Sequence, residues 1–382
     1  MANRKRRKQP RYFDFALLFI ILFLLVFGLI VLYSTSSYNA QLKTGDSLYY
    51  LKNQTKNTII GIAAMILFIT VDYHLCVRCS VLAYIGAIIL CFMVKFTPLG
   101  VEYNGARRWL NLGIQFQPAE VAKIALVLFL AFYIVKLGKR ISQFKSLVLI
   151  MVFSIVMAGC VYILTDNLSS GIIIGGIGVV MAFVAYPDAK PFVIGGTVVA
   201  LIVGILLYYI FNIMVVDENT GFRWLRILVW KNPENYASGK GYQTLQALYA
   251  IGSGSFFGKG LGKSIQKLGY IPEAQNDMIF SIICEELGLF GALCILLIFA
   301  MMIWRFMYIA SNAPDLQGSL VVVGIMAHIA IQVILNVAVV ANVIPNTGIT
   351  LPFISYGGTS VVFLLMEMGI ALNVSSKIKI EN

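Results

Sequence analysis

Long apolar runs separated by short polar stretches make up most of the chain. The first run, Phe15 to Tyr33, contains 19 residues and no charged side chain, so it is long enough to cross the hydrocarbon core of a bilayer as a helix. Similar runs recur along the sequence and predict ten membrane-spanning helices. They lie near residues 13–34, 56–71, 80–97, 118–137, 146–164, 170–186, 192–216, 277–304, 318–342 and 356–376.

This pattern predicts an all-α polytopic membrane protein, because a helix satisfies its own backbone hydrogen bonds in lipid. The chain reads as one membrane domain, residues 1–382, with a basic tail at residues 1–12. The longest polar connection, residues 217–276, joins the seventh and eighth predicted helices. A connection of this length in a compact protein is usually functional or disordered. Its segments RWLRILVW and GYQTLQALYAIGSGSFFG predict partial order, with short helices lying on the membrane surface.

The composition agrees with a membrane protein. Hydrophobic residues fill 59% of the 382 positions, charged residues fill 12%, and the mean hydropathy is +0.86, whereas a soluble domain is roughly 45–50% apolar. The basic start NRKRRKQPR followed by an apolar run is similar to a secretory signal peptide. The run is too long for one, and many similar runs follow, so we expect a retained first span.

The distribution of positive charge predicts the orientation of the chain. With the N-terminus in the cytoplasm, the tails and inner loops hold 15 Lys and Arg residues and the short outer loops hold five. Because positive loops stay in the cytoplasm, both termini are expected there, and residues 217–276 are expected outside. The net charge of +12 therefore reports topology. The basic tail is expected to contact membrane lipids, and nothing typical of a nucleic-acid module is present.

Acidic residues cluster around the start of the eighth predicted helix. Glu273, Asp277, Glu285 and Glu286 all lie in the segment LGYIPEAQNDMIFSIICEELGLFG. Asp277 lies where an acid often caps a helix, and Glu285, eight residues further on, shares roughly the same helix face. Charges within a span are costly and mark pathways or partners. The sequence leaves both a cap and a functional group open for Asp277.

Two pairs of charged residues around the fourth predicted helix are candidates for substrate contacts. Arg107 and Arg108 suit phosphate oxygens, which a guanidinium binds in a bidentate manner, and the alternative is an anchor at the membrane surface. Glu120 and Lys123 lie at i and i+3, so they can pair on one helix face. This pair is either a structural ion pair or part of a site.

The segment from residue 342 to 360 is rich in Pro and Gly and interrupts two apolar runs. Non-helical backbone at membrane depth must be buried or line a cavity, so we expect this segment to fold inward. Gln332 and Asn336, one helical turn apart, would face the same interior. His328, one turn further along, is expected to be a satisfied interior histidine.

The sequence defines no metal site. Cys76 and Cys79 form a CxxC pair beside His74, but a metal needs about four ligands and no second pair occurs. The six cysteines fall mostly in apolar runs and suggest no disulfide framework.

Several segments together resemble one known family. They are NGARRWL, QPAEVAK, GYQTLQALYAIGSG, LGYIPEAQNDMIF, EELGLFG and PNTGITLPFISYGG, in this order. They resemble the SEDS family (shape, elongation, division and sporulation), which includes FtsW, RodA and SpoVE, from the first span to about Ser375. The resemblance implies a ten-span glycosyltransferase of the bacterial cytoplasmic membrane that polymerises lipid II into peptidoglycan. It also implies a class B penicillin-binding protein, a transpeptidase, as partner, and leaves a division, elongation or sporulation role open.

The resemblance also implies site residues. The essential acid of the family follows a Pro-Glu pair, which maps it to Asp277 after Pro272 and Glu273. The family pattern TDF reads NDM here, QPSE reads QPAE with Ala119, and DLGT is replaced by DNLSS from Asp166, to which we assign no role. The residues expected to contact substrate are Arg107, Arg108, Glu120, Lys123, Arg226, Gln243, Lys267, Glu273, Asn336 and Ser355.

In the implied reaction, Asp277 is a general base that takes a proton from the acceptor sugar hydroxyl. Cations stabilise the departing undecaprenyl pyrophosphate, and the anomeric carbon inverts. No organic cofactor is expected, and a divalent cation, Mg²⁺ or Mn²⁺, is a candidate aid. A flippase or transporter for lipid-linked precursors also fits interior acids and broken spans. A non-catalytic scaffold for a synthase is the third hypothesis.

Overall fold

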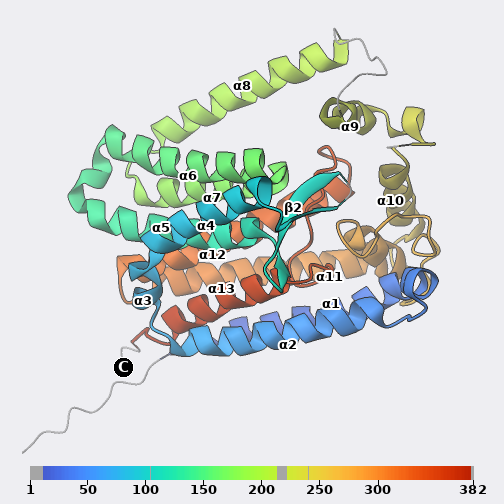
Figure 1. Cartoon of the computed structure of the whole chain (residues 1–382), viewed down its shortest axis with the longest axis horizontal. Helices are drawn as coiled ribbons and strands as arrows, with labels where there is room; N and C mark the ends of the chain where they lie inside the picture. Colours follow the sequence, from blue (N-terminus) through green and yellow to red (C-terminus); the bar gives the residue numbers. More distant parts are fainter. Residues whose placement is uncertain (1–11, 104, 213–221, 240, 380–382) are drawn as a thin grey trace, which may run out of the picture.

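The computed structural model describes residues 12–103, 105–212, 222–239 and 241–379 (Figure 1). Of the predicted basic tail, all but Tyr12 lies outside the described residues. Most of the long helices run side by side (Figure 1). The helices are α1 Phe15–Thr44, α2 Tyr49–Thr70, α3 Tyr73–Arg78, α4 Ser80–Phe96, α5 Pro118–Leu137, α6 Phe144–Thr165, α7 Leu168–Ala185, α8 Lys190–Asn212, α9 Phe222–Lys231, α10 Tyr242–Ser253, α11 Ile279–Ser311, α12 Leu316–Val340 and α13 Ser360–Ser375.

Each predicted span overlaps one of these helices. Within the described residues, seven helices are long and apolar enough to cross a membrane, namely α1, α5, α6, α7, α8, α11 and α12, with α5 extended by the 3-10 turn η1 (Gly138–Ser142). α4 and α13 are apolar but shorter, and the first half of α2 is polar. The prediction of a mostly helical, polytopic membrane protein with several long apolar helices is confirmed.

One part of the fold prediction was wrong, because the chain is not entirely α-helical. The connection between α4 and α5 forms a three-stranded antiparallel sheet, with β1 Gly100–Tyr103, β2 Ala106–Asn111 and β3 Gln115–Phe116. Tyr103 pairs with Ala106, so two residues, Asn-Gly in the sequence, join the first two strands. Asn-Gly is a strong signal for a two-residue hairpin, which a search for long apolar windows does not detect.

The interior of the bundle is built around α12. Of its most apolar 18-residue window, 67% is buried inside the protein, against 6% for α8, which lies apart from the other helices at the edge of the molecule (Figure 1). Apolar residues exposed on the outer helices are expected in a membrane protein, because lipid tails are as apolar as they are. Small residues allow close packing, and a Cβ on Gly324 of α12 would come within 2.6 Å of a Val127 methyl carbon on α5.

The two described ends of the chain meet at one end of the bundle. The Tyr12 N–H donates to the Ile378 carbonyl at 3.1 Å. Asp14 caps α1 by accepting from the Leu17 N–H at 2.8 Å, and it forms a buried ion pair with Arg305 of α11 at 2.7 Å. The described residues nearest the two termini therefore lie at the same end of the helix bundle.

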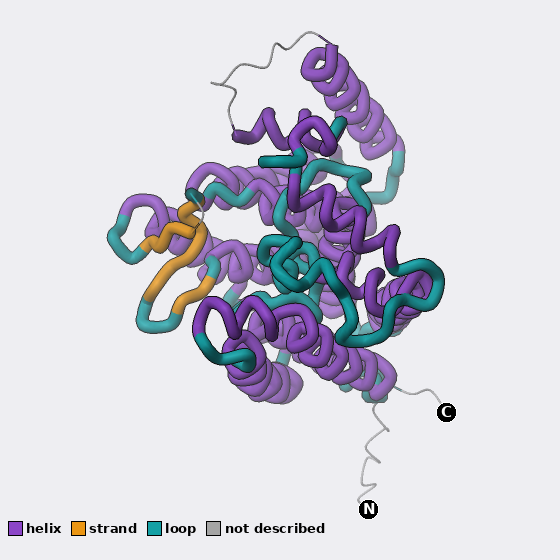
Figure 2. The backbone as a smooth tube through the Cα atoms, turned by 90° about the vertical axis from the view of Figure 1, so that its right-hand side faces the viewer, coloured by secondary structure: helices purple, strands orange, loops and turns teal. Residues whose placement is uncertain are grey.

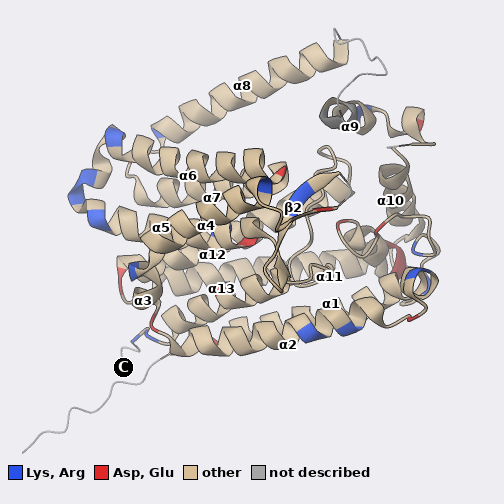
Figure 3. Cartoon of the chain, in the orientation of Figure 1, with Lys and Arg blue, Asp and Glu red and all other residues tan. Residues whose placement is uncertain are grey.

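The opposite end of the bundle carries the sheet and the long connection between α8 and α11. Figure 2 shows this end facing the viewer, with strands and loops gathered over the helices. The connection contains α9, the 3-10 turn η2 (Pro233–Tyr236) and α10, so the predicted partial order of residues 217–276 is confirmed for its described residues. Charged residues concentrate toward the two ends, and the helical middle has few (Figure 3).

Candidate functional site

Asp277 lies two residues before α11, with its side chain partly exposed. The Gln243 side chain of α10 donates to Asp277 Oδ1 at 3.4 Å and to the Pro272 carbonyl at 3.2 Å. The N-cap of α11 is Met278, and no side chain caps that helix end. Asp277 therefore does not cap α11, so the capping alternative is wrong and its carboxylate needs another explanation.

A second layer orients the amide that faces Asp277. The Asn346 side-chain N–H donates to Gln243 Oε1 at 3.3 Å, so the amino group of Gln243 is the end that faces Asp277. Arg226 of α9 in turn donates to the Asn346 carbonyl at 3.2 Å. These residues surround a cavity of about 260 Å³, whose lining includes Arg226, Trp230, Gln243, Pro272, Asn342 and Asn346.

The environment of Asp277 makes it a stronger base than an ordinary aspartate. Burial raises the pKa of its carboxyl to about 6, and the negative charge of Glu273 adds to the increase. The positive charge of Arg226 and the hydrogen bond from Gln243 lower the pKa by smaller amounts. The group is therefore largely ionised at neutral pH and holds a proton more firmly than usual.

Polar residues of α12 support the backbone next to Asp277. The Asn336 amide donates to the Asp277 carbonyl at 2.9 Å and to the Ile349 carbonyl at 2.7 Å. One turn away, the Gln332 amide donates to the Thr350 carbonyl at 3.0 Å. The non-helical segment after α12 is thus fastened to that helix at two points, and one of them also holds Asp277.

A buried chain of ionisable groups continues below Gln332. Lys123 pairs with Glu120 at 2.9 Å and donates to Gln332 Oε1 at 3.4 Å. On its other side, Gln332 Oε1 lies 2.9 Å from His328 Nε2, and His328 Nδ1 lies 2.7 Å from Glu367 on α13. The pairing predicted for Glu120 and Lys123 is confirmed, and His328 is a satisfied interior histidine as expected.

The inward fold predicted for residues 342–360 is confirmed. Leu351 and Ser355 are buried, and the Leu351 N–H donates to the Ser355 hydroxyl at 2.8 Å. The Tyr356 N–H donates to the Gln275 carbonyl at 2.9 Å, which ties this segment to the connection before α11. Ser355 therefore shapes the loop from inside.

Arg107 binds backbone carbonyls next to the sheet. Its guanidinium donates to the carbonyls of Lys95 at 3.1 Å, Thr97 at 2.6 Å and Gly100 at 3.2 Å. It joins the C-terminal end of α4 to β1, where helix carbonyls lack intrahelical partners. Arg108 follows on β2 and is partly exposed. A phosphate-binding role for these two residues stays a prediction.

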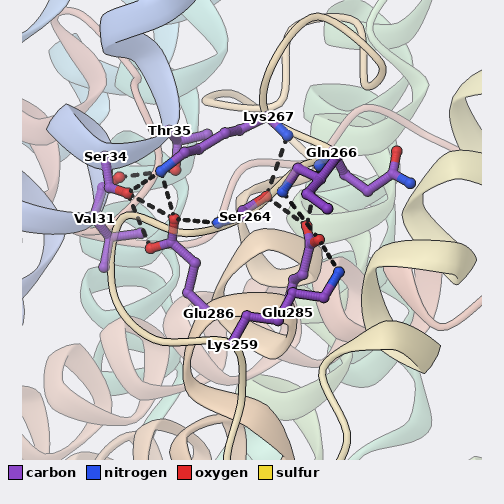
Figure 4. A network of polar contacts seen from close by, with 10 residues as sticks. Val31, Ser34, Thr35, Lys259, Ser264, Gln266, Lys267, Glu285 and Glu286 are labelled. Atoms are coloured by element: carbon purple, nitrogen blue, oxygen red, sulfur yellow. Dashed lines mark hydrogen bonds and ion pairs between the residues drawn. The ribbon is translucent and has the colours of Figure 1, made fainter.

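Glu285 and Glu286, on α11, are both engaged in ion pairs (Figure 4). Glu285 binds Lys259 at 2.7 Å, and Glu286 binds Lys267 at 2.7 Å and the Ser34 hydroxyl of α1 at 2.8 Å. Both lysines belong to the connection between α10 and α11. Lys267 is buried in this network, so the geometry gives it a structural partner, and its predicted substrate contact stays untested.

The backbone of α11 is interrupted at Gly288, which has φ 70° and ψ −173°. In a continuous helix, the N–H groups of Leu289 and Phe290 would donate four residues back, to Glu285 and Glu286. Here they donate at 3.0 Å to the carbonyls of Ser255 and Phe256 in the preceding connection.

The same connection supplies donors for the two carbonyls that the interruption leaves free. The N–H groups of Lys259 and Gly260 donate to the carbonyls of Glu285 and Glu286, each at 2.9 Å. Residues 255–260 are therefore spliced into the helix, and we call this contact the splice. It satisfies backbone groups that lipid cannot satisfy.

Five predicted site residues are brought together by the fold. Each of the others is linked to Asp277 by a hydrogen bond or an electrostatic interaction, directly or through one intervening residue. The five residues are Arg226, Gln243, Glu273, Asp277 and Asn336. Glu120 and Lys123 join the support below them through Gln332. Asn346 was missed, although its place in the Pro- and Gly-rich segment was a signal, because only the tertiary structure brings it to Gln243.

Fold and site together define a multi-pass membrane protein with a polar centre at one end of its helix bundle. A family model described as "Cell cycle protein", covering FtsW, RodA and SpoVE, matches residues 15–380. The chain therefore belongs to the SEDS family.

Known proteins resemble it over nearly their whole lengths. "Stage V sporulation protein E" of Bacillus subtilis is 39% identical over 95% of this chain and 96% of that protein. A "Probable peptidoglycan glycosyltransferase FtsW" of Geobacter metallireducens is 34% identical over 97% of each. A chain from the solved structure "Structural coordination of polymerization and crosslinking by a peptidoglycan synthase complex" aligns with a TM-score of 0.78 and 25% identity, covering 95% of this chain and 97% of that one.

Proposed function

We propose that the protein is a peptidoglycan glycosyltransferase that polymerises lipid II, with Asp277 as its general base. One observation carries this proposal. A partly exposed carboxylate with a pKa of about 6 accepts a hydrogen bond from Gln243, which lines a cavity together with Arg226, and it lies outside the long apolar helices. A base with a pKa near the working pH is the kind of group that activates a sugar hydroxyl.

In the proposed reaction, the acceptor hydroxyl loses its proton to Asp277 as its oxygen bonds to the anomeric carbon of the donor. The bond from that carbon to the pyrophosphate breaks with its electron pair, so undecaprenyl pyrophosphate leaves and the carbon inverts. Pyrophosphate leaves readily, so one carboxylate suffices where glycoside hydrolysis uses two.

The departing pyrophosphate gathers negative charge, which fixed cations stabilise. Arg226 lines the cavity and is the protein cation that we assign to this role. The described residues include no group of three His, Cys, Asp or Glu side chains that could hold a metal ion. We therefore propose that a divalent cation, Mg²⁺ or Mn²⁺, would be bound mainly by the pyrophosphate of the substrate, and we assign no organic cofactor.

The proposed setting is the bacterial cytoplasmic membrane, crossed by ten helices. Both termini are cytoplasmic, and the connection between α8 and α11 with Asp277 faces outward, where the glycan is built. We propose a class B penicillin-binding protein as partner, and the similarity to a chain of a peptidoglycan synthase complex supports this. A flippase for lipid-linked precursors is the second candidate, favoured by the buried chain from Glu120 to Glu367.

The test is polymerisation by the purified protein with its partner transpeptidase, using lipid II and a transpeptidase inhibitor. Glycan chains are resolved on a gel. We expect Asp277→Asn to reduce the rate by about 10²- to 10⁴-fold, as expected for loss of a general base. Asp46→Asn, which alters an exposed ion pair, is the matched control and should polymerise normally.

Full polymerisation by a folded Asp277→Asn protein would exclude Asp277 as the base. If the wild-type protein makes no polymer with any class B partner, and instead moves lipid II across vesicle membranes, the flippase replaces the glycosyltransferase as the function.

A further inference from the structure

Three phenylalanines at the splice are exposed although they lie at one end of an apolar bundle. The exposed fractions are 52% for Phe256, 77% for Phe257 and 54% for Phe290. Their ring centroids lie 4.8 to 6.4 Å apart, so they form one aromatic cluster. Leaving such large apolar side chains in water is unfavourable, which indicates that something apolar covers them.

The depth of this cluster follows from two helices. In α1, the apolar run Phe15–Tyr33 lies between Asp14 and Ser34; in α11, Arg305 and Glu286 lie 19 residues apart. Asp14 pairs with Arg305, and Ser34 bonds to Glu286. At about 1.5 Å per residue, the continuous helix α1 places these two polar levels about 30 Å apart, which is the thickness of a bilayer core.

The aromatic cluster lies just inside the polar level of Ser34 and Glu286. Phe290 follows Glu286 by four residues toward Arg305, just beyond the interruption at Gly288, so it lies on the Arg305 side of this polar level. The Phe256 carbonyl accepts from the Phe290 N–H, so the tip of the connection lies at the same depth. Aromatic rings are enriched at this level of a membrane.

The backbone of the tip is suited to this depth. Non-helical backbone is tolerated at membrane depth only when its polar groups have partners. The four hydrogen bonds of the splice supply them, and the Gly258 N–H donates to the Gly254 carbonyl at 2.8 Å. The Lys259 ammonium turns inward to Glu285, while Lys263 is exposed, where it can meet anionic lipid headgroups.

We propose that the Phe256–Phe257 tip inserts into the leaflet on its own side of the bilayer and anchors the connection before Asp277 to lipid. The occupant of this surface is the lipid bilayer itself. The exposed face of α11 continues from the cluster through Leu293 and Leu297, so the tip extends a surface that lipid already covers. The anchor fixes the height of residues 254–276 above the membrane.

The test uses the otherwise wild-type full-length chain in nanodiscs of phosphatidylethanolamine and phosphatidylglycerol. A photoreactive benzoylphenylalanine replaces Phe257, and adducts are identified by mass spectrometry after illumination. The same replacement at Leu297 is the lipid-exposed control, and at Asn235, exposed in η2, the aqueous control. We expect lipid adducts at positions 257 and 297 and none at position 235.

Replacement at Phe256 gives a second reading of the same tip and should also form lipid adducts. The proposal fails if position 257 behaves like position 235 while position 297 labels lipid. It also fails if position 257 crosslinks to a second copy of the protein in place of lipid. Neither result depends on polymerisation, so the outcome is independent of the proposed enzymatic function.

Discussion

At the scale of single residues, the acids around the start of α11 have the same charge and different surroundings. Glu285 and Glu286 each face a lysine at 2.7 Å, and these pairs hold the connection to the helix. The pKa of Asp277 is raised to about 6, mainly by burial. The difference comes from what each carboxylate faces, and it supports a structural role for the glutamates and the proposed catalytic role for Asp277.

The pKa of Asp277 predicts the acid side of the activity profile. Because the base must be ionised, polymerisation should fall as the pH is lowered through about 6, by about tenfold per pH unit well below the pKa. The measurement is the initial rate of glycan formation between pH 5 and 8. A rate that stays constant down to pH 5 would contradict the raised pKa or the role of Asp277.

Gln243 should tune this profile. Its hydrogen bond stabilises the ionised form of Asp277 and lowers its pKa, so Gln243→Leu should raise that pKa and move the acid limb to higher pH. Gln143→Leu, at an exposed glutamine before α6, is the control and should leave the profile unchanged. If Gln243→Leu lowers the rate but the pH at which the rate falls is unchanged, Gln243 acts on substrate alone.

At the scale of elements, the splice joins two different kinds of segment, an apolar helix and a glycine-rich loop. Gly258 and Gly288 make this possible, since a Cβ on Gly288 would lie 2.4 Å from the Gly258 nitrogen and one on Gly258 would lie 2.2 Å from the Glu286 carbonyl oxygen. Both residues also have positive φ, which side chains rarely adopt.

Gly258→Ala and Gly288→Ala should each lower the free energy of unfolding by about 1–3 kcal/mol or more, as overpacking does. Gly252→Ala on α10, where a Cβ would meet nothing within 4 Å, is the matched control and should be neutral or stabilising. Titration with a denaturing detergent measures the difference. Equal stability of all three variants would exclude a rigid splice.

The ion pair of Lys267 and Glu286 gives a second prediction at this scale. Lys267→Met should cost about 3–5 kcal/mol, because it leaves Glu286 charged and buried without its cation. The double variant Lys267→Met/Glu286→Gln should recover part of this loss, since no buried charge remains. The same detergent titration measures both variants.

Lys52→Met, which breaks the exposed pair with Asp46, is the control and should change stability by about 1 kcal/mol or less. A double variant that recovers none of the loss caused by Lys267→Met would mean that the two charges do not interact.

At the scale of the whole molecule, the described ends meet on one side and Asp277 lies on the other. On the first side, the Tyr12–Ile378 hydrogen bond and the Asp14–Arg305 ion pair hold the two described ends together. Gln243, Asn336 and Asn346 converge from α10, α12 and the following segment on the second. The catalytic centre that we propose thus depends on elements distributed from α9, which carries Arg226, to the segment after α12.

This arrangement predicts the topology in cells. Reporters that fluoresce only in the cytoplasm should be active when fused to either terminus, and a tag inserted at residue 235 should be accessible from outside. The reason is that the excess of Lys and Arg falls on the side of the termini. Two termini with opposite locations, or a tag accessible only after permeabilisation, would contradict the proposed orientation.

Much of the architecture was predictable from apolar length alone. A single apolar run such as Phe15–Tyr33 forms a helix in lipid, because a helix satisfies the hydrogen bonds of its own backbone there. The sheet was missed because strands of two to six residues leave no such signature. The pairing of Glu120 with Lys123 was predictable from its spacing, and Asp277 was selected as the candidate acid by its motif, since both features are local.

The sequence by itself determined the class of protein, the approximate course of its helices and the acid most worth testing, because these follow from composition and short-range pattern. Tertiary structure decided which carboxylates are neutralised, where α11 breaks and which amides face Asp277. These depend on contacts such as Ser34–Glu286 and Asn346–Gln243, whose members are separated by more than 100 residues. Hydrogen bonds and burial across such separations exist only once the helices have packed.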